Sequence, residues 1–111
     1  MKRLSFSLCI LMMLALVLSA RAQTGTGNIQ GTVTDSSGAA VPGAKISVVH
    51  TQTARQNDTV TNTAGFYLFP SMQTGPYKIT VQATGMQPWQ GELLLQVGQT
   101  AVVEPMLKVA A

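Results

Sequence analysis

The chain has 111 residues, a formal net charge of +3 and a single cysteine. The excess positive charge lies at the N-terminal end, because residues 23–111 contain four basic and four acidic side chains. Without a basic patch to neutralise phosphates, residues 23–111 give no indication of nucleic-acid binding. A lone Cys9 excludes an internal disulfide, and a chain of this length has room for one domain.

The first 22 residues have the composition of a signal peptide. Lys2 and Arg3 form a positive n-region, an apolar run follows over residues 8–18, and Ala20-Arg21-Ala22 matches the small-x-small pattern that signal peptidase cleaves. We therefore expect a hydrophobic helical leader at 1–22, cleaved between Ala22 and Gln23. The apolar run is shorter than the ~20 residues of a membrane-spanning helix, so we expect no transmembrane anchor after cleavage. The sequence thus predicts export across the inner membrane to the periplasm, the outer membrane or the exterior.

After a polar and glycine-rich lead-in at 23–28, short alternations of apolar and polar residues predict strands. In the first half of the chain these strands are expected at 29–34, 44–51 and 55–61. Two turn signals separate the first pair. Asp35-Ser36-Ser37-Gly38 allows an aspartate to bond its own backbone, and Val41-Pro42-Gly43 is typical of a type II turn.

The second half of the chain predicts a loop at 70–75 and four more strands, at 66–69, 76–83, 89–97 and 100–109. The strand at 76–83 has the most regular alternation, which predicts that Tyr77, Ile79 and Val81 face the core. Pro105 restricts the last strand to an edge or a bulge. Seven short strands at this spacing predict an all-β fold, a seven-stranded antiparallel Greek-key β-sandwich over residues 29–109.

Several different short motifs, most of them at expected turns, follow one another along residues 28–109. The motifs are Gly31-x-Val33-x-Asp35, Gly38, Val41-Pro42-Gly43-Ala44, Thr63-x-Gly65-x-Tyr67, Gly75-x-Tyr77-x-Ile79-x-Val81 and Gly85. Together they resemble the carboxypeptidase regulatory-like domain. The resemblance implies a prealbumin-like sandwich of the carbohydrate-binding-like type, which acts as an accessory module. Its relatives lie beside metallocarboxypeptidase domains, in bacterial surface proteins and at the N-terminus of TonB-dependent outer-membrane receptors.

The side chains that carry chemistry do not form a catalytic pattern. His50 is the only histidine, and residues 23–111 contain no cysteine to complete a zinc site with it. We expect His50 to be a solvated or edge residue at the end of its strand. The acidic residues are scattered, so no carboxylate pair is indicated. The sequence predicts no catalytic residue, no metal site and no cofactor.

The aromatic residues are the candidates for ligand contact. Phe66, Tyr67 and Phe69 share one short strand and must divide between its two faces, so either Tyr67 or Phe66 is expected to be exposed. Trp89 either caps the core or stands out as a platform for stacking a sugar, and capping is the favoured interpretation. Trp89 and Tyr67 are therefore the residues to test first. Tyr77 is expected to bury its ring and bond its hydroxyl to the backbone.

These observations predict an exported, non-enzymatic β-sandwich that serves as an interaction or structural module at the cell envelope. Its partner would be a glycan or an envelope protein. A carbohydrate-binding module is the first alternative, and the orphan N-terminal domain of a TonB-dependent receptor is the second. A row of coplanar exposed aromatic side chains would favour the sugar, whereas an exposed edge strand with an apolar rim would favour protein docking by strand addition.

Overall fold

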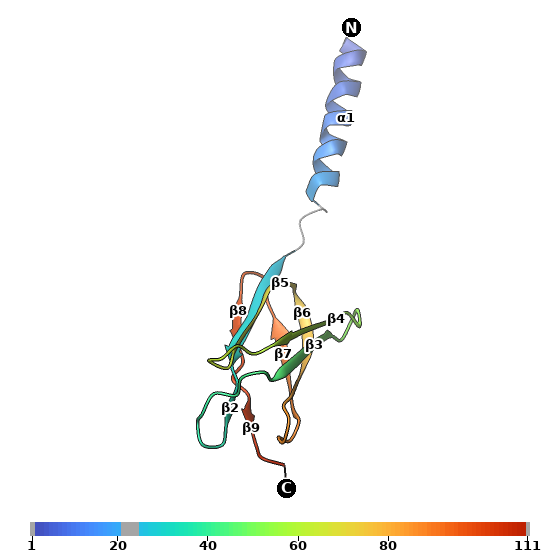
Figure 1. The fold of residues 1–111 in the computed structure, drawn as a ribbon. Coiled ribbons are helices and arrows are strands. Elements are labelled where there is room, and N and C mark those ends of the chain that lie inside the picture. The colour runs from blue at the N-terminus through green and yellow to red at the C-terminus, as the bar shows by residue number, and fades with distance from the viewer. Residues whose placement is uncertain (1, 21–24, 111) are drawn as a thin grey trace.

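The computed structural model describes residues 2–20 and 25–110. Helix α1 (Lys2–Ala20) forms the N-terminal part, and β-strands form the rest (Figure 1). The helix coincides with most of the predicted leader, whereas the predicted cleavage site at Ala22 and Gln23 lies outside the described residues. In neither described stretch does a helix combine the length and hydropathy that a membrane crossing requires.

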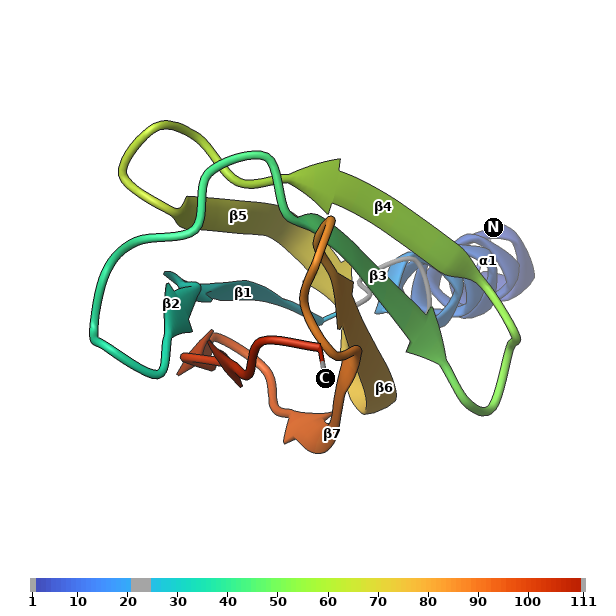
Figure 2. The same ribbon diagram turned by 60° about the horizontal axis from the view of Figure 1, so that its bottom comes forward.

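Two facing sheets and a short ribbon contain all the strands of the described residues. The strands are β1 (Thr26–Thr32), β2 (Thr34–Asp35), β3 (Lys45–His50), β4 (Gln56–Val60), β5 (Phe66–Gln73), β6 (Gly75–Gln82), β7 (Trp89–Leu95), β8 (Thr100–Val102) and β9 (Met106–Leu107). One sheet has the order β5-β1-β8 and the other β4-β3-β6-β7, while β2 pairs with β9. Figure 2 shows β5 and β1 on one side of the molecule and β3, β4 and β6 on the other. The all-β sandwich is confirmed.

The predicted first and last strands are each divided in two. Val33 is the one residue between β1 and β2, and its backbone bonds to Gly65 and Val41. Between β8 and β9, Pro105 has no N–H to donate, and its carbonyl accepts a hydrogen bond from Thr34 at 3.0 Å. The C-terminal segments run parallel to their partners, β8 beside β1 and β9 beside β2, whereas the expectation was purely antiparallel. All other strand pairs are antiparallel.

The predicted loop at 70–75 is wrong over most of its length, because β5 continues to Gln73. Pro70 is tolerated because β5 is an edge strand, where a missing N–H removes no bond of the sheet. The register with β1 shifts by one residue near Pro70, and Ser71 has a positive φ of 53°. Such a one-residue excess is a β-bulge, and the Asn28 Oδ1 atom accepts a hydrogen bond from the Ser71 N–H at 2.9 Å.

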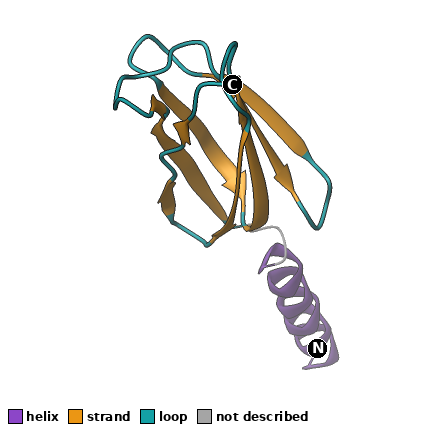
Figure 3. Ribbon diagram, turned by 90° about the horizontal axis from the view of Figure 1, so that it is seen from below, coloured by secondary structure: helices purple, strands orange, loops and turns teal. Residues whose placement is uncertain are grey.

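Figure 3 shows the strands of the sandwich from below. Among the side chains that the structure describes, the buried core residues fall within 29–107. Tyr77, Ile79 and Val81 are at most 3% exposed while Lys78 faces water, so the predicted register of β6 is confirmed. The core residues from the other elements are Ile29, Val33, Val41, Ala44, Ile46, Val48, Tyr67, Phe69, Met72, Leu95, Ala101 and Leu107. Residues 2–15 of α1 are exposed and contribute nothing to this core, in which apolar residues of the sandwich pack against one another.

Candidate functional site

Tyr67 is a core residue, which corrects the expectation that it contacts a ligand. It is 2% exposed, and the outward position on β5 belongs to Phe66, which is 38% exposed. The Tyr67 hydroxyl donates a hydrogen bond to the Val103 carbonyl at 2.7 Å. Burial, and secondarily the charge of Glu104, raises the pKa of Tyr67 to about 12. Its hydroxyl is therefore neutral and structurally engaged.

Gly31 makes the position of Tyr67 feasible. A Cβ atom at Gly31 would collide with the carbonyl oxygen of Val103 and would lie 3.1 Å from the Tyr67 hydroxyl. Only a residue without a side chain lets the β1 backbone approach this carbonyl. Gly31, Tyr67 and Val103, called the Tyr67 cluster below, thus join β5, β1 and the segment after β8 in one dense contact.

Trp89 packs against the core, in agreement with the favoured interpretation that it is a cap. It is neither fully buried nor projecting, and its ring lies over Gly91, where an added Cβ would clash with the indole. The outer part of Trp89 lines a shallow depression of about 230 Å³. The other lining residues are Gln87, Pro88, Met106 and Lys108.

His50 is buried, so the expectation of a solvated or edge histidine is wrong. It is 2% exposed and lies on β3, an interior strand. The Thr53 N–H donates to Nδ1 at 3.3 Å, and Nε2 lies 3.0 Å from the Thr74 carbonyl. Because a carbonyl only accepts, Nε2 carries the proton and donates. His50 therefore binds the turn that connects β5 to β6, where the chain passes from one sheet to the other.

Two features of that turn explain why the histidine is enclosed. Gly75 has a φ of 136°, and a Cβ atom there would collide with the His50 ring. Tyr77 packs edge-on against the same imidazole, with 5.0 Å between ring centroids. The Tyr77 hydroxyl donates to the Gln73 carbonyl at 2.5 Å, as the expectation of a backbone-bonded tyrosine requires.

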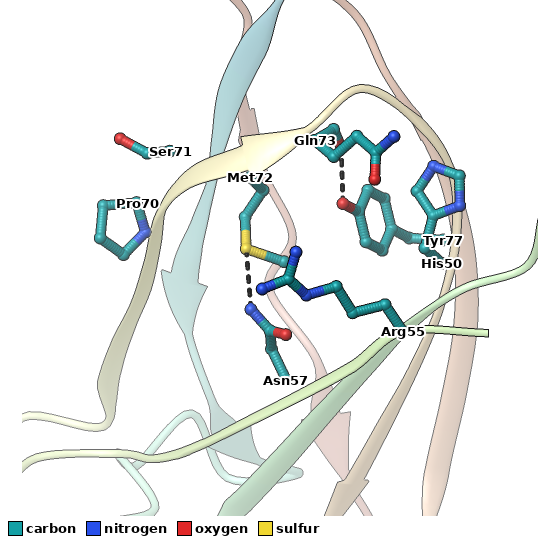
Figure 4. A pocket seen from close by; sticks show the side chains of 8 residues that line it. All are labelled: His50, Arg55, Asn57, Pro70, Ser71, Met72, Gln73 and Tyr77. Atoms are coloured by element: carbon teal, nitrogen blue, oxygen red, sulfur yellow. Dashed lines mark hydrogen bonds between the residues drawn. The ribbon is translucent and has the colours of Figure 1, made fainter. Parts of the chain in front are cut away.

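A small polar pocket opens beside Tyr77, between the edge strands β4 and β5 of the two sheets (Figure 4). It has a volume of about 120 Å³, and we call it the edge pocket. Its lining residues are His50, Arg55, Asn57, Pro70, Ser71, Met72, Gln73 and Tyr77. Figure 4 shows the side chain of Arg55, the residue just before β4, extending across the pocket toward Met72. Arg55, Ser71 and Gln73 also line an adjoining open depression of about 340 Å³.

The edge pocket is electrostatically one-sided. Arg55 is the cation of its lining, and no carboxylate contributes to it. The acidic residues all have other surroundings: Asp35 accepts bonds from Ser37 and Ala39, Asp58 accepts from Gln56 near Lys45, Glu104 lies near Tyr67, and Glu92 lines a separate depression. Burial raises the pKa of Tyr77, and the positive charge of Arg55 opposes that rise. The positive charge of Arg55 therefore acts on the Tyr77 hydroxyl at the pocket.

The edge pocket was not predicted from the sequence. Its polar groups come from Arg55, from the start of β4 and from the end of β5, which are separated along the chain and meet only when the two sheets pack. The expected strand at 55–61 would place Arg55 and Asn57 on one face, although β4 itself begins at Gln56. That pattern did not indicate that these side chains would lie opposite β5.

Comparison with known proteins agrees with the fold. The model of the carboxypeptidase regulatory-like domain family matches residues 28–108, and no curated protein matches the chain significantly. Among solved structures, the Bacillus anthracis TIE protein superposes with a TM-score of 0.68 at 16% identity over 78% of this chain and 17% of its own. The chain thus spans less than a fifth of that protein.

Two dioxygenases also share the fold. Wild-type catechol 1,2-dioxygenase from Acinetobacter radioresistens has a TM-score of 0.64 at 14% identity, over 84% of this chain and 55% of its own. The dioxygenase domain of a dioxygenase–carbohydrate-binding protein fusion from Streptomyces sp. SirexAA-E has a TM-score of 0.62 at 13% identity, over 79% and 82%. At such identities the similarity concerns the fold alone. The family match and the turn motifs agree: this chain belongs to the carboxypeptidase regulatory-like domain family.

Proposed function

We propose that this domain is a non-catalytic binding module of an exported protein, and that it binds its partner at the edge pocket. One observation carries the proposal: the pocket's two acid–base groups are already bonded to the backbone. Both ring nitrogens of His50 and the hydroxyl of Tyr77 have backbone partners. A general base must instead be able to reach the proton it removes from the substrate.

The remaining polar groups of the pocket are suited to holding a ligand. Arg55, Asn57 and Gln73 offer N–H donors at the rim, and Met72 with Tyr77 provides an apolar floor. A few convergent polar groups over an apolar base are typical of binding sites. The membership in a family of regulatory-like domains supports the same function.

The cellular setting proposed here is the envelope or the exterior, where the partner is a glycan or an envelope protein. The proposal depends on the charged and apolar pattern of residues 1–22. Intact-mass measurement of the exported protein tests it, and a chain beginning at Gln23 is the expected result. Full-length protein retained in the membrane would contradict the leader.

The non-catalytic function is tested with the full-length protein in a non-ionic detergent. We expect no turnover of peptide, ester or glycoside substrates. We also expect saturable binding of the glycan or envelope-protein partner, with changes at the residues of the edge pocket. Peptidase or glycosidase turnover that co-purifies with the protein through successive columns, and disappears in His50→Gln, would overturn the proposal. An Asn57→Ala variant serves as a comparison, because it changes the pocket without removing an acid–base group.

The depression beside Trp89 supports a second candidate function, carbohydrate binding. A partly buried indole flanked by Gln87 and Lys108 offers an edge for stacking with hydrogen-bond donors at its rim. A glycan array with wild type, Trp89→Ala and the neighbouring control Met106→Ala tests it. Sugar binding that is lost only in Trp89→Ala would favour this site over the edge pocket, whereas a wild-type array without signal would exclude it.

A further inference from the structure

The edge pocket has a selective donor arrangement as well as a positive charge. The Asn57 Nδ2 atom donates to the sulfur of Met72 at 3.3 Å. A thioether is a weak acceptor, so this N–H gains by exchanging sulfur for an anionic oxygen. The Arg55 guanidinium adds a planar set of donors that matches a carboxylate in a bidentate geometry. The amide of Asn57 on β4 and the guanidinium of Arg55, just before β4, both line the pocket and therefore offer donors to the same ligand group.

The size of the edge pocket limits what it accepts. Its volume of about 120 Å³ lies well below the roughly 300–1,000 Å³ typical of pockets that enclose a whole small molecule. A single functional group fits, and the rest of the ligand would lie in the adjoining depression that shares Arg55, Ser71 and Gln73. The ligand is therefore compact at its bound end and polar beyond it.

The charge of the pocket distinguishes between anions. One guanidinium with neutral amide donors balances one negative charge, which corresponds to a carboxylate. A phosphate carries about −1.5 to −2 at neutral pH and is commonly held by several cations or by a nest of backbone N–H groups. The lining of the edge pocket has one arginine and no other cation.

We infer that the edge pocket binds the carboxylate of a small acidic ligand, with Arg55 as its charged anchor. This inference rests on the binding function proposed above and adds the chemical class of the ligand. A carboxylate of this kind comes from an acidic sugar or from the end of a peptide. The two sources share the recognised group and differ in the part that would occupy the adjoining depression.

Matched pairs of probes test the inference on isotope-labelled full-length protein in a non-ionic detergent. D-glucuronate is compared with D-glucose, and N-acetylalanine with its amide, by NMR titration. We expect at least one acid to shift the backbone amide signals of Arg55, Asn57 and Gln73 and to bind about tenfold more tightly than its neutral partner. The acid that binds identifies the source. Neutral partners that bind equally well, no shift at the pocket with either acid, or inorganic phosphate binding as tightly as the acids would each overturn it.

A matched pair of variants assigns the effect to Arg55. Arg55→Gln removes an exposed cation at the pocket and is expected to weaken acid binding about tenfold or more. Lys78→Gln removes an exposed cation on the outer face of the four-stranded sheet and is expected to leave binding unchanged. Equal binding in the two variants contradicts the inference. If a ligand still perturbs the edge pocket but binds wild type and Arg55→Gln equally well, the binding function stands and only the carboxylate inference fails.

Discussion

The two buried tyrosines each donate a hydrogen bond to a backbone carbonyl, but one lies in dense packing and the other beside a pocket. Tyr67 and Tyr77 are 2% and 3% exposed, and each donates to a backbone carbonyl. Around Tyr67 the packing leaves no room for a Cβ on Gly31, whereas Tyr77 borders a pocket whose arginine opposes the rise in its pKa. The difference indicates that the sandwich is held rigid at the Tyr67 cluster and keeps space for a partner beside Tyr77.

The largest expected effect is at Gly31. In Gly31→Ala the new methyl group meets the backbone oxygen of Val103, which no side-chain rotation relieves. We expect a loss of about 4 kcal/mol or more in the free energy of unfolding, or failure to fold. Urea denaturation followed by circular dichroism measures it.

Gly38→Ala is the control for Gly31→Ala. Gly38 has a φ of 86° but no atom within 4 Å of an added Cβ, so this variant has backbone strain without a collision. Its expected cost is about 1 kcal/mol. Equal losses in the two variants would contradict a dense Tyr67 cluster.

Removing each tyrosine hydroxyl sharpens the comparison. Tyr67→Phe leaves the Val103 carbonyl without its partner in a packed region, which should cost about 1–3 kcal/mol of unfolding free energy. Tyr77→Phe should cost less than about 1 kcal/mol, because Gln73 is exposed and its carbonyl can bond to water in the pocket. Thermal and urea unfolding of both variants measure the difference. A larger loss of unfolding free energy in Tyr77→Phe than in Tyr67→Phe would contradict the assignment of dense packing to Tyr67 and open space to Tyr77.

A further effect of the buried Tyr67 hydroxyl is expected in alkaline solution. The pKa of Tyr67 is about 12 in the fold, whereas an unfolded tyrosine ionises near pH ~10. The unfolded state therefore releases its proton first, so the contribution of Tyr67 is complete below pH ~10 and is lost as the pH rises toward 12. Wild type should lose more stability than Tyr67→Phe over this interval. Parallel profiles of unfolding free energy against pH would contradict the burial of the Tyr67 hydroxyl.

Local sequence patterns predicted much of the fold, because strand alternation and turn chemistry act over a few residues. The register of Tyr77, Ile79 and Val81 is confirmed, and Gly38 and Gly43 have the positive φ that their turns require. Pro70 misled the prediction because its effect depends on whether β5 is an edge strand, which is a property of the whole sheet.

The functional site was beyond local patterns for a similar reason. The two-residue period shows that Tyr67 and Phe69 share a face, but not that this face is the inner one. His50 bonds to a carbonyl 24 residues further along the chain, a contact that only the packed sheets create. The edge pocket likewise requires β4 and β5 to meet, so Arg55 had no recognisable role in the sequence.

One paired measurement tests the division of roles most directly. Unfolding free energy and affinity for the acid that binds wild type are determined for Tyr67→Phe and Arg55→Gln. We predict that Tyr67→Phe lowers stability by about 1–3 kcal/mol and leaves affinity unchanged, while Arg55→Gln lowers affinity about tenfold and leaves stability within about 0.5 kcal/mol of wild type. If each variant changes both quantities together, or if Arg55→Gln changes only stability, the rigid cluster and the binding pocket are not separate regions.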